Sequence, residues 1–295
     1  MSLLRVLATC IVVCVFSALQ LQAQKATCTN WNTWLLNPTN PTAGPSGDPR
    51  GVNDNRTVVG DATFSVNPPK FWGFVHYLSG KVTYWRPANA RFSTFEGRNN
   101  VGNTVGNYLD TLGIHHAAYL HGSTTTLIVH PKAAHHSTQL FAINNLNTLL
   151  GYYQDSNGVN HTFKRRSDGT FLSVPNFPGA QICCSFAVAF NDNGVVVGTY
   201  RLNDPNGVNH GFIYRNGSFA TLDYRNNARA GTRLVGIAAN DVIVGNVYSK
   251  SFLYKNGVFK DIFGPHGELV SVSGISANGV ITGGFNGRGF TVNCQ

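Results

Sequence analysis

The sequence is poor in charged residues and poorest in glutamate. Lys and Arg together number 22 against 13 Asp and Glu, and Glu96 and Glu268 are the only glutamates. No pair of carboxylates is marked by its surroundings as a general acid and base. The sequence also lacks a Gly-x-Ser-x-Gly elbow, a His-Glu-x-x-His motif and a phosphate-binding loop. It therefore carries no signature of catalysis, although a site assembled from distant residues stays open.

Long apolar runs are also absent, except for one at the start of the chain. Arg5 precedes the mostly apolar run 6–19, and Ala23 follows as a small residue suited to cleavage. The run is too short for a comfortable membrane span, and no later stretch could cross a bilayer. We therefore expect a signal peptide over 1–23 and a single exported domain over 24–295, extracellular or periplasmic.

Glycine, asparagine, threonine and aromatic residues are abundant, which is typical of short strands joined by many turns. Six tripeptides ending in glycine recur every 38 to 47 residues, and most follow an Asn-rich turn. They are 58–60, 104–106, 149–151, 196–198, 243–245 and 281–283. This periodicity predicts six copies of one β-rich unit of roughly 45 residues.

The fourth copy shows the expected strand pattern. Its four strands are predicted at 185–190, 195–200, 211–215 and 218–224, and Asn216-Gly217 is a strong signal for a two-residue hairpin. Short strands at this spacing indicate an all-β array and not βαβ units.

The repeat resembles the HAF family of bacterial extracellular repeat proteins, named for a His-Ala-Phe-like tripeptide. The matching positions are His161-Thr162-Phe163 and His210-Gly211-Phe212, with His116-Ala117-Ala118 as a weaker copy. The resemblance covers essentially the whole mature chain. It implies a secreted repeat protein and leaves its activity undefined.

A four-stranded unit cannot bury both faces alone, so neighbouring units must stack, and stacking into a ring leaves only short edges. The last copy stops after its third strand, at 290–293, whereas 30–36 reads as a lone N-terminal strand with Trp31 and Trp34. Together they would complete one unit. The sequence thus predicts a six-bladed β-propeller of four-stranded antiparallel blades, closed by the N-terminal strand.

The cysteines agree with this closure. Cys28 and Cys294 fall where the missing hairpin turn of the last unit would lie, which predicts a disulfide between them in an exported protein; the alternative is two free thiols. The adjacent Cys183 and Cys184 form either a vicinal disulfide or two buried thiols. A lone pair has too few ligands for a structural zinc site.

The strand order predicts two different ends of the ring. The Asn-rich turns and the hairpins share one end, here the turn end. The loops joining consecutive units, and those between second and third strands, share the other, the linker end, where binding usually resides. Basic residues gather on these linkers, and we expect them to converge on the channel mouth. The candidate ligand-binding residues are Arg91, Lys132, His135, His136, Arg229 and Arg233.

The net charge of +9, near +8 without Arg5, favours an anionic partner. We expect a monomeric, non-catalytic binding or scaffold protein that contacts an anionic polysaccharide or an envelope surface, not nucleic acid. The alternative is a carbohydrate-active hydrolase or lyase with a carboxylate pair at the channel mouth. A third possibility is a structural module with a large apolar patch. No cofactor and no metal are expected, because the repeated histidines lie too far apart in a ring to share an ion.

Overall fold

The computed structural model describes residues 24–35, 47–64, 70–203 and 207–295, without the side chains of Ile182 and Cys183. The predicted signal peptide over 1–23 lies outside these residues. The proposed vicinal disulfide depends on the Cys183 side chain, so it also lies outside the description. Within the described part of the chain, no helix is long and apolar enough to cross a membrane.

The described residues form β-strands throughout, with one 3-10 turn, η1 (Tyr224–Asn226), and no α-helix. Two strands come first, β1 (Gln24–Lys25) and β2 (Cys28–Leu35). Four-strand groups then follow one another along the chain. The first two are β3 (Gly47–Val52), β4 (Val58–Phe64), β5 (Lys70–His76), β6 (Val82–Trp85), and β7 (Ala90–Arg98), β8 (Thr104–Asp110), β9 (His115–His121), β10 (Thr124–Ile128).

The next two groups are β11 (Gln139–Ile143), β12 (Leu149–Gln154), β13 (Asn160–Arg165), β14 (Phe171–Val174), and β15 (Ala180–Phe190), β16 (Val196–Leu202), β17 (His210–Arg215), β18 (Ser218–Thr221). The last strands are β19 (Arg233–Ile237), β20 (Ile243–Val247), β21 (Lys250–Lys255), β22 (Val258–Ile262), and β23 (Ser271–Ile275), β24 (Val280–Phe285), β25 (Arg288–Cys294). In the fourth copy, β15 begins earlier than predicted. β18 ends earlier than predicted, because the chain turns into η1 after Thr221.

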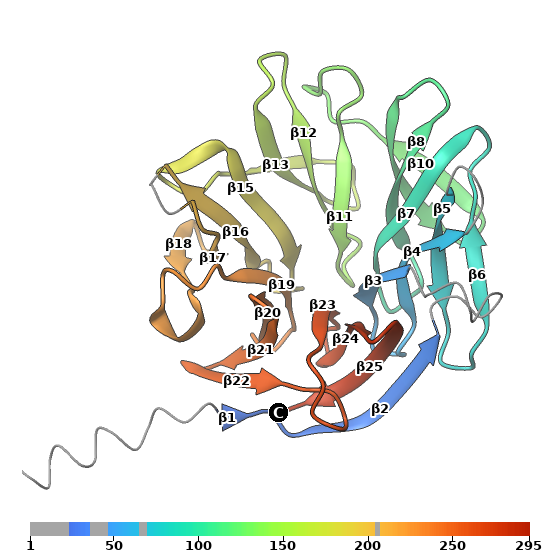
Figure 1. The fold of residues 1–295 in the computed structure, drawn as a ribbon. Helices are drawn as coiled ribbons and strands as arrows, with labels where there is room; N and C mark the ends of the chain where they lie inside the picture. The colour runs from blue at the N-terminus through green and yellow to red at the C-terminus, as the bar shows by residue number, and fades with distance from the viewer. Residues whose placement is uncertain (1–23, 36–46, 65–69, 204–206) are drawn as a thin grey trace, which may run out of the picture.

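The strands make antiparallel sheets in a β-propeller-like arrangement around a central axis (Figure 1). β11–β14 and β15–β18 are four-stranded sheets, and β19–β22 gain β1 as a fifth strand through a parallel pairing with β22. A parallel bridge between Phe71 of β5 and Phe92 of β7 joins the first two groups into one eight-stranded sheet. The first strand of each group lies innermost. The all-β prediction is therefore confirmed.

The N-terminal strand pairs with the last strand of the chain. β2 lies antiparallel to β25, so its sheet has the order β2-β25-β24-β23. Cys28 stands opposite Cys294, and the two form a disulfide across 266 positions of sequence. Trp31 of β2 packs on Phe290, with ring centroids 5.1 Å apart. The predicted Cys28–Cys294 bond is confirmed.

The recurring glycine of each second strand has a packing role. In every copy but the second, it pairs across the ladder with a phenylalanine of the third strand, as Gly198 does with Phe212. A Cβ on Gly198 would lie 2.2 Å from the Phe186 carbonyl oxygen and 2.5 Å from the Phe212 ring. The glycine thus makes room for a ring that is almost wholly buried. This explains why the sequence repeats both residues.

Hydrogen bonds between turns run from one strand group to the next at the turn end. The buried Asn99 side chain donates to the Asn144 carbonyl oxygen at 3.1 Å and to Asn147 Oδ1 at 2.8 Å. Further contacts of this kind, in chain order, are Asp54 to Asn100, Asn100 to Asn145, Asn145 to Asp192, Asn193 to Ala239, Ala239 to Ala277, and Asn278 back to Asp54. The Asn-rich turns therefore tie the sheets to one another.

Candidate functional site: the central channel

A channel of about 750 Å³ runs along the axis. Residues of all the first strands line it, namely those of β3, β7, β11, β15, β19 and β23. A smaller cavity of about 60 Å³ lies at the turn end, bounded by the Asn-rich turns. Because the first strands surround the axis, their inward side chains decide what the channel can bind.

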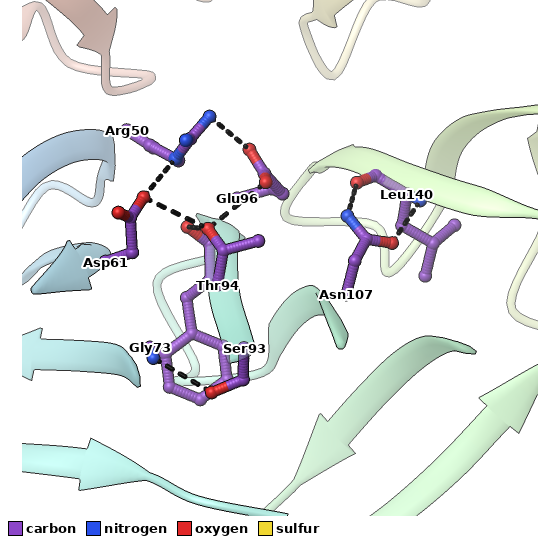
Figure 2. Close-up of polar contacts among 9 residues, drawn as sticks. Arg50, Asp61, Gly73, Ser93, Thr94, Glu96, Asn107 and Leu140 are labelled. Atoms are coloured by element: carbon purple, nitrogen blue, oxygen red, sulfur yellow. Dashed lines mark hydrogen bonds and ion pairs between the residues drawn. The ribbon is translucent and has the colours of Figure 1, made fainter. Parts of the chain in front are cut away.

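A polar cluster surrounds Arg50, which lines the channel together with Glu96 (Figure 2). Arg50 Nε donates to Asp61 Oδ1 at 2.7 Å, and Arg50 Nη1 donates to Glu96 Oε2 at 3.4 Å. The Thr94 hydroxyl lies 3.2 Å from Glu96 Oε1 and 3.5 Å from Asp61 Oδ1. One guanidinium thus bridges carboxylates from two neighbouring strand groups.

The two carboxylates share this hydroxyl, so Glu96 Oε1 and Asp61 Oδ1 are at most about 7 Å apart. This upper bound admits the shorter separations of acid–base pairs in glycosidases. The surroundings of the two carboxylates differ. Burial raises the pKa of Glu96, while Arg50 and the Thr94 hydroxyl act in the opposite direction. Asp61 holds the shorter contact to the guanidinium. The arrangement offers a polar ligand one guanidinium and two carboxylates with different surroundings.

Neighbouring contacts fix the strands that carry this cluster. The Asn107 carboxamide exchanges two hydrogen bonds of 2.9 Å with the Leu140 backbone, which holds β8 against β11 (Figure 2). Ser93 accepts from the Gly73 backbone at 3.0 Å and donates to the Trp85 carbonyl oxygen at 2.6 Å. Ser93 thus ties β7 to β5 and to the end of β6, and β8, which pairs with β7, is held against β11.

Of the candidate ligand-binding residues, Arg233 alone lines the channel. It is exposed, at the start of β19. Arg91 at the start of β7 and the linker residues Lys132, His135, His136 and Arg229 are exposed as well, but none of them belongs to the channel wall. The expected convergence of linker charges on the channel mouth is therefore limited to Arg233 among the described residues.

Other basic residues of the linkers are used in packing. The Arg86 guanidinium stacks over aromatic rings of its own sheet. The His130 ring stacks on Tyr153 with a centroid distance of 3.8 Å. Arg225 forms an ion pair of 3.2 Å with the buried Asp261. These three side chains therefore have structural partners.

The repeated histidines each contact a carboxylate. The contacts are His116 with Asp110 at 2.9 Å, His161 with Asp155 at 2.8 Å, and His210 with Asp223 at 2.9 Å. Among the described residues, no group of three or more His, Cys, Asp or Glu could hold a metal ion. The histidines that carry the family resemblance therefore support turns and packing.

Sequence reasoning missed Arg50, Asp61 and Glu96. One signal was present, because Arg50 and Glu96 occupy the same place in successive copies, each three residues before the Asn that opens the turn, Asn53 or Asn99. Opposite charges at equivalent positions of adjacent units indicate a contact around the ring.

Comparison with known proteins shows the fold. No protein-family model matches the sequence, and no curated protein matches it. The β-propeller domain of the Trilobed protease from Pyrococcus furiosus is similar with a TM-score of 0.54 and 10% identity, over 81% of this chain and 91% of that one. A gluconolactonase from Xanthomonas campestris is similar with a TM-score of 0.52 and 9% identity, over 93% of this chain and 99% of that one. At these identities the likeness establishes a β-propeller fold alone.

Proposed function

We propose that this protein is an exported, non-catalytic six-bladed β-propeller, closed by β2, that binds an anionic glycan or envelope partner through its linker end. The pairing of β2 with β25, the disulfide and the contacts between turns support the closed ring. The resemblance to HAF-repeat proteins and the N-terminal signal-like segment support export.

Unpaired exposed cations at the linker end carry this proposal. Arg233 is exposed where β19 borders the channel, Arg91 is exposed at the start of β7, and Lys132 and Arg229 are exposed on linkers. Within the described part of the chain, none of these four forms an ion pair. Free cations on one face attract a polyanion, and arginine suits its carboxylates or phosphates.

Polygalacturonate tests this proposal, with neutral dextran as the control polymer. We expect the protein to bind polygalacturonate, with an affinity that falls as salt is added, and not dextran. The double variant Arg229→Ala, Arg233→Ala should bind at least about tenfold more weakly, equivalent to 1.4 kcal/mol. Arg166→Ala removes one positive charge from a hairpin turn at the opposite end and should bind as the wild type does. Binding that is absent, or that survives in the double variant, would refute the proposal.

The carboxylate pair favours a second candidate, a carbohydrate-active hydrolase or lyase. Glu96 and Asp61 lie close enough to the same Thr94 hydroxyl to admit the spacing of an acid–base pair, although Arg50 contacts both. Release of oligosaccharides from polygalacturonate would support this function if Glu96→Gln abolishes it while Glu268→Gln, in an exposed loop, does not. Binding without product release would leave the first proposal alone.

A further inference from the structure

Arg98 is the last residue of β7 and carries a guanidinium group. Its Nη1 donates to the Thr104 hydroxyl at 2.7 Å, and its Nε is buried with no hydrogen-bond partner. Among the described residues, no acidic side chain lies within ion-pair distance of it. Burial accordingly lowers the pKa of Arg98 from its ordinary value. An arginine keeps its proton in proteins, so the positive charge and a spare donor remain.

A pocket of about 450 Å³ opens beside this guanidinium at the turn end. Tyr77, Trp85 and Phe95 supply aromatic surface, and Trp85 stacks on Phe95 with a centroid distance of 4.8 Å. Val75 and Leu120 add apolar surface. The pocket is therefore an aromatic cavity with a single strong charge at one side.

The turn beside the pocket leaves room for the guanidinium. A Cβ on Gly102 would lie 2.9 Å from Arg98 Nη2, and the backbone of Gly102 has a φ of +91°, which other residues rarely adopt. The Arg98 guanidinium also lies over the Tyr77 ring, 6.0 Å from its centroid. These contacts hold the charge in place and leave its Nε unsatisfied.

We propose that this pocket binds a small ligand in which a ring carries one carboxylate, with Arg98 receiving the carboxylate and the aromatic wall stacking on the ring. Arg98 is half-buried, and a charge partly removed from water without a counter-ion is costly, whereas a carboxylate matches the planar donors of arginine. Uronic sugars and aromatic acids share this chemistry. The site lies at the opposite end from Arg233 and does not depend on the function proposed above.

Phenylacetate and D-glucuronate serve as probes, with phenylacetamide and D-glucose as their neutral counterparts. Titration calorimetry should detect binding of at least one acid by the wild-type protein and much weaker binding of its neutral counterpart. Binding of phenylacetate would indicate an aromatic ligand, and binding of D-glucuronate would indicate a sugar ligand. We expect Arg98→Gln to weaken binding at least about tenfold, because a hydrogen-bonded charge is lost. Arg165→Gln is the matched control, since Arg165 also stacks on an aromatic ring and lies outside the pocket. Arg233→Ala should leave binding of these probes unchanged.

Nuclear magnetic resonance gives a second readout that needs no variant. The side-chain N–H resonances of Arg98 should shift when the acid is added to the wild-type protein, because the carboxylate changes the surroundings of the guanidinium. The proposal is overturned if neither acid binds at millimolar concentration, if the neutral counterparts bind equally well, or if the Arg98→Gln variant binds as the wild type does. An Arg98 resonance that stays fixed at saturation would overturn it as well.

Discussion

Loss of the Cys28–Cys294 disulfide should lower stability by an amount that follows from the length of the chain it closes. The bond links residues 266 positions apart, so the chain-entropy model gives about 5.6 kcal/mol at 25 °C. Measured values for native disulfides usually fall below the model. The β2–β25 ladder and the packing of Trp31 on Phe290 stay available without the bond. We therefore expect a loss of about 4 kcal/mol, or about 10 °C in Tm.

The double variant Cys28→Ser, Cys294→Ser tests this value without disturbing Cys183 and Cys184. Guanidinium unfolding followed by tryptophan fluorescence gives the free energy of unfolding for both proteins. The variant should also show a larger denaturant slope, because its unfolded chain is no longer cross-linked and exposes more surface. Equal free energies of unfolding would contradict the claim that the bond closes a long loop in the native protein.

Three further predictions concern the packing, the channel and the turns. Gly198→Ala should lower the free energy of unfolding by about 3 kcal/mol or more, because the new methyl group meets a carbonyl oxygen and a buried ring; an unchanged unfolding curve would contradict the packing account. The pKa of Glu96 is raised in the folded protein from its ordinary value of 4.5, so folding takes up protons at this carboxyl group. The contribution of Glu96 to the free energy of unfolding therefore falls as the pH rises above 4.5. The stability of the wild type relative to Glu96→Gln should therefore be higher at pH 4 than at pH 7, and the opposite order in urea unfolding would refute this. Asn99→Ala should lower the free energy of unfolding, measured by thermal unfolding, by about 2 kcal/mol, because it removes buried hydrogen bonds to the next strand group and within its own turn. Asn157→Ala, at an exposed position, should lower it much less.

Local sequence signals predicted much of the fold because they depend on neighbours in the chain. The Asn216-Gly217 hairpin forms with both residues at positive φ, and Arg215 pairs with Ser218 as expected. The Cys28–Cys294 pairing was predictable because the incomplete first and last units complement each other.

The site was harder to predict because its residues meet only through the ring. Arg50 and Glu96 stand 46 residues apart, and their contact depends on two first strands lying side by side at the axis. Arg98 gives no local signal either, since its lack of a counter-ion depends on which side chains surround it in space. The candidate linker cations are exposed, but their directions relative to the channel depend on loop paths that the sequence does not specify.

The pairing of β2 with β25 also bears on the order in which the protein folds. Cys28 and Cys294 are 266 positions apart, so β2 is synthesised long before β25. Until β25 has been made, β2 lacks its antiparallel partner and Cys28 has no Cys294 thiol with which to pair. Completion of this sheet is therefore a late step of folding, and an oxidant that acts before β25 is available would trap Cys28 in a wrong pairing.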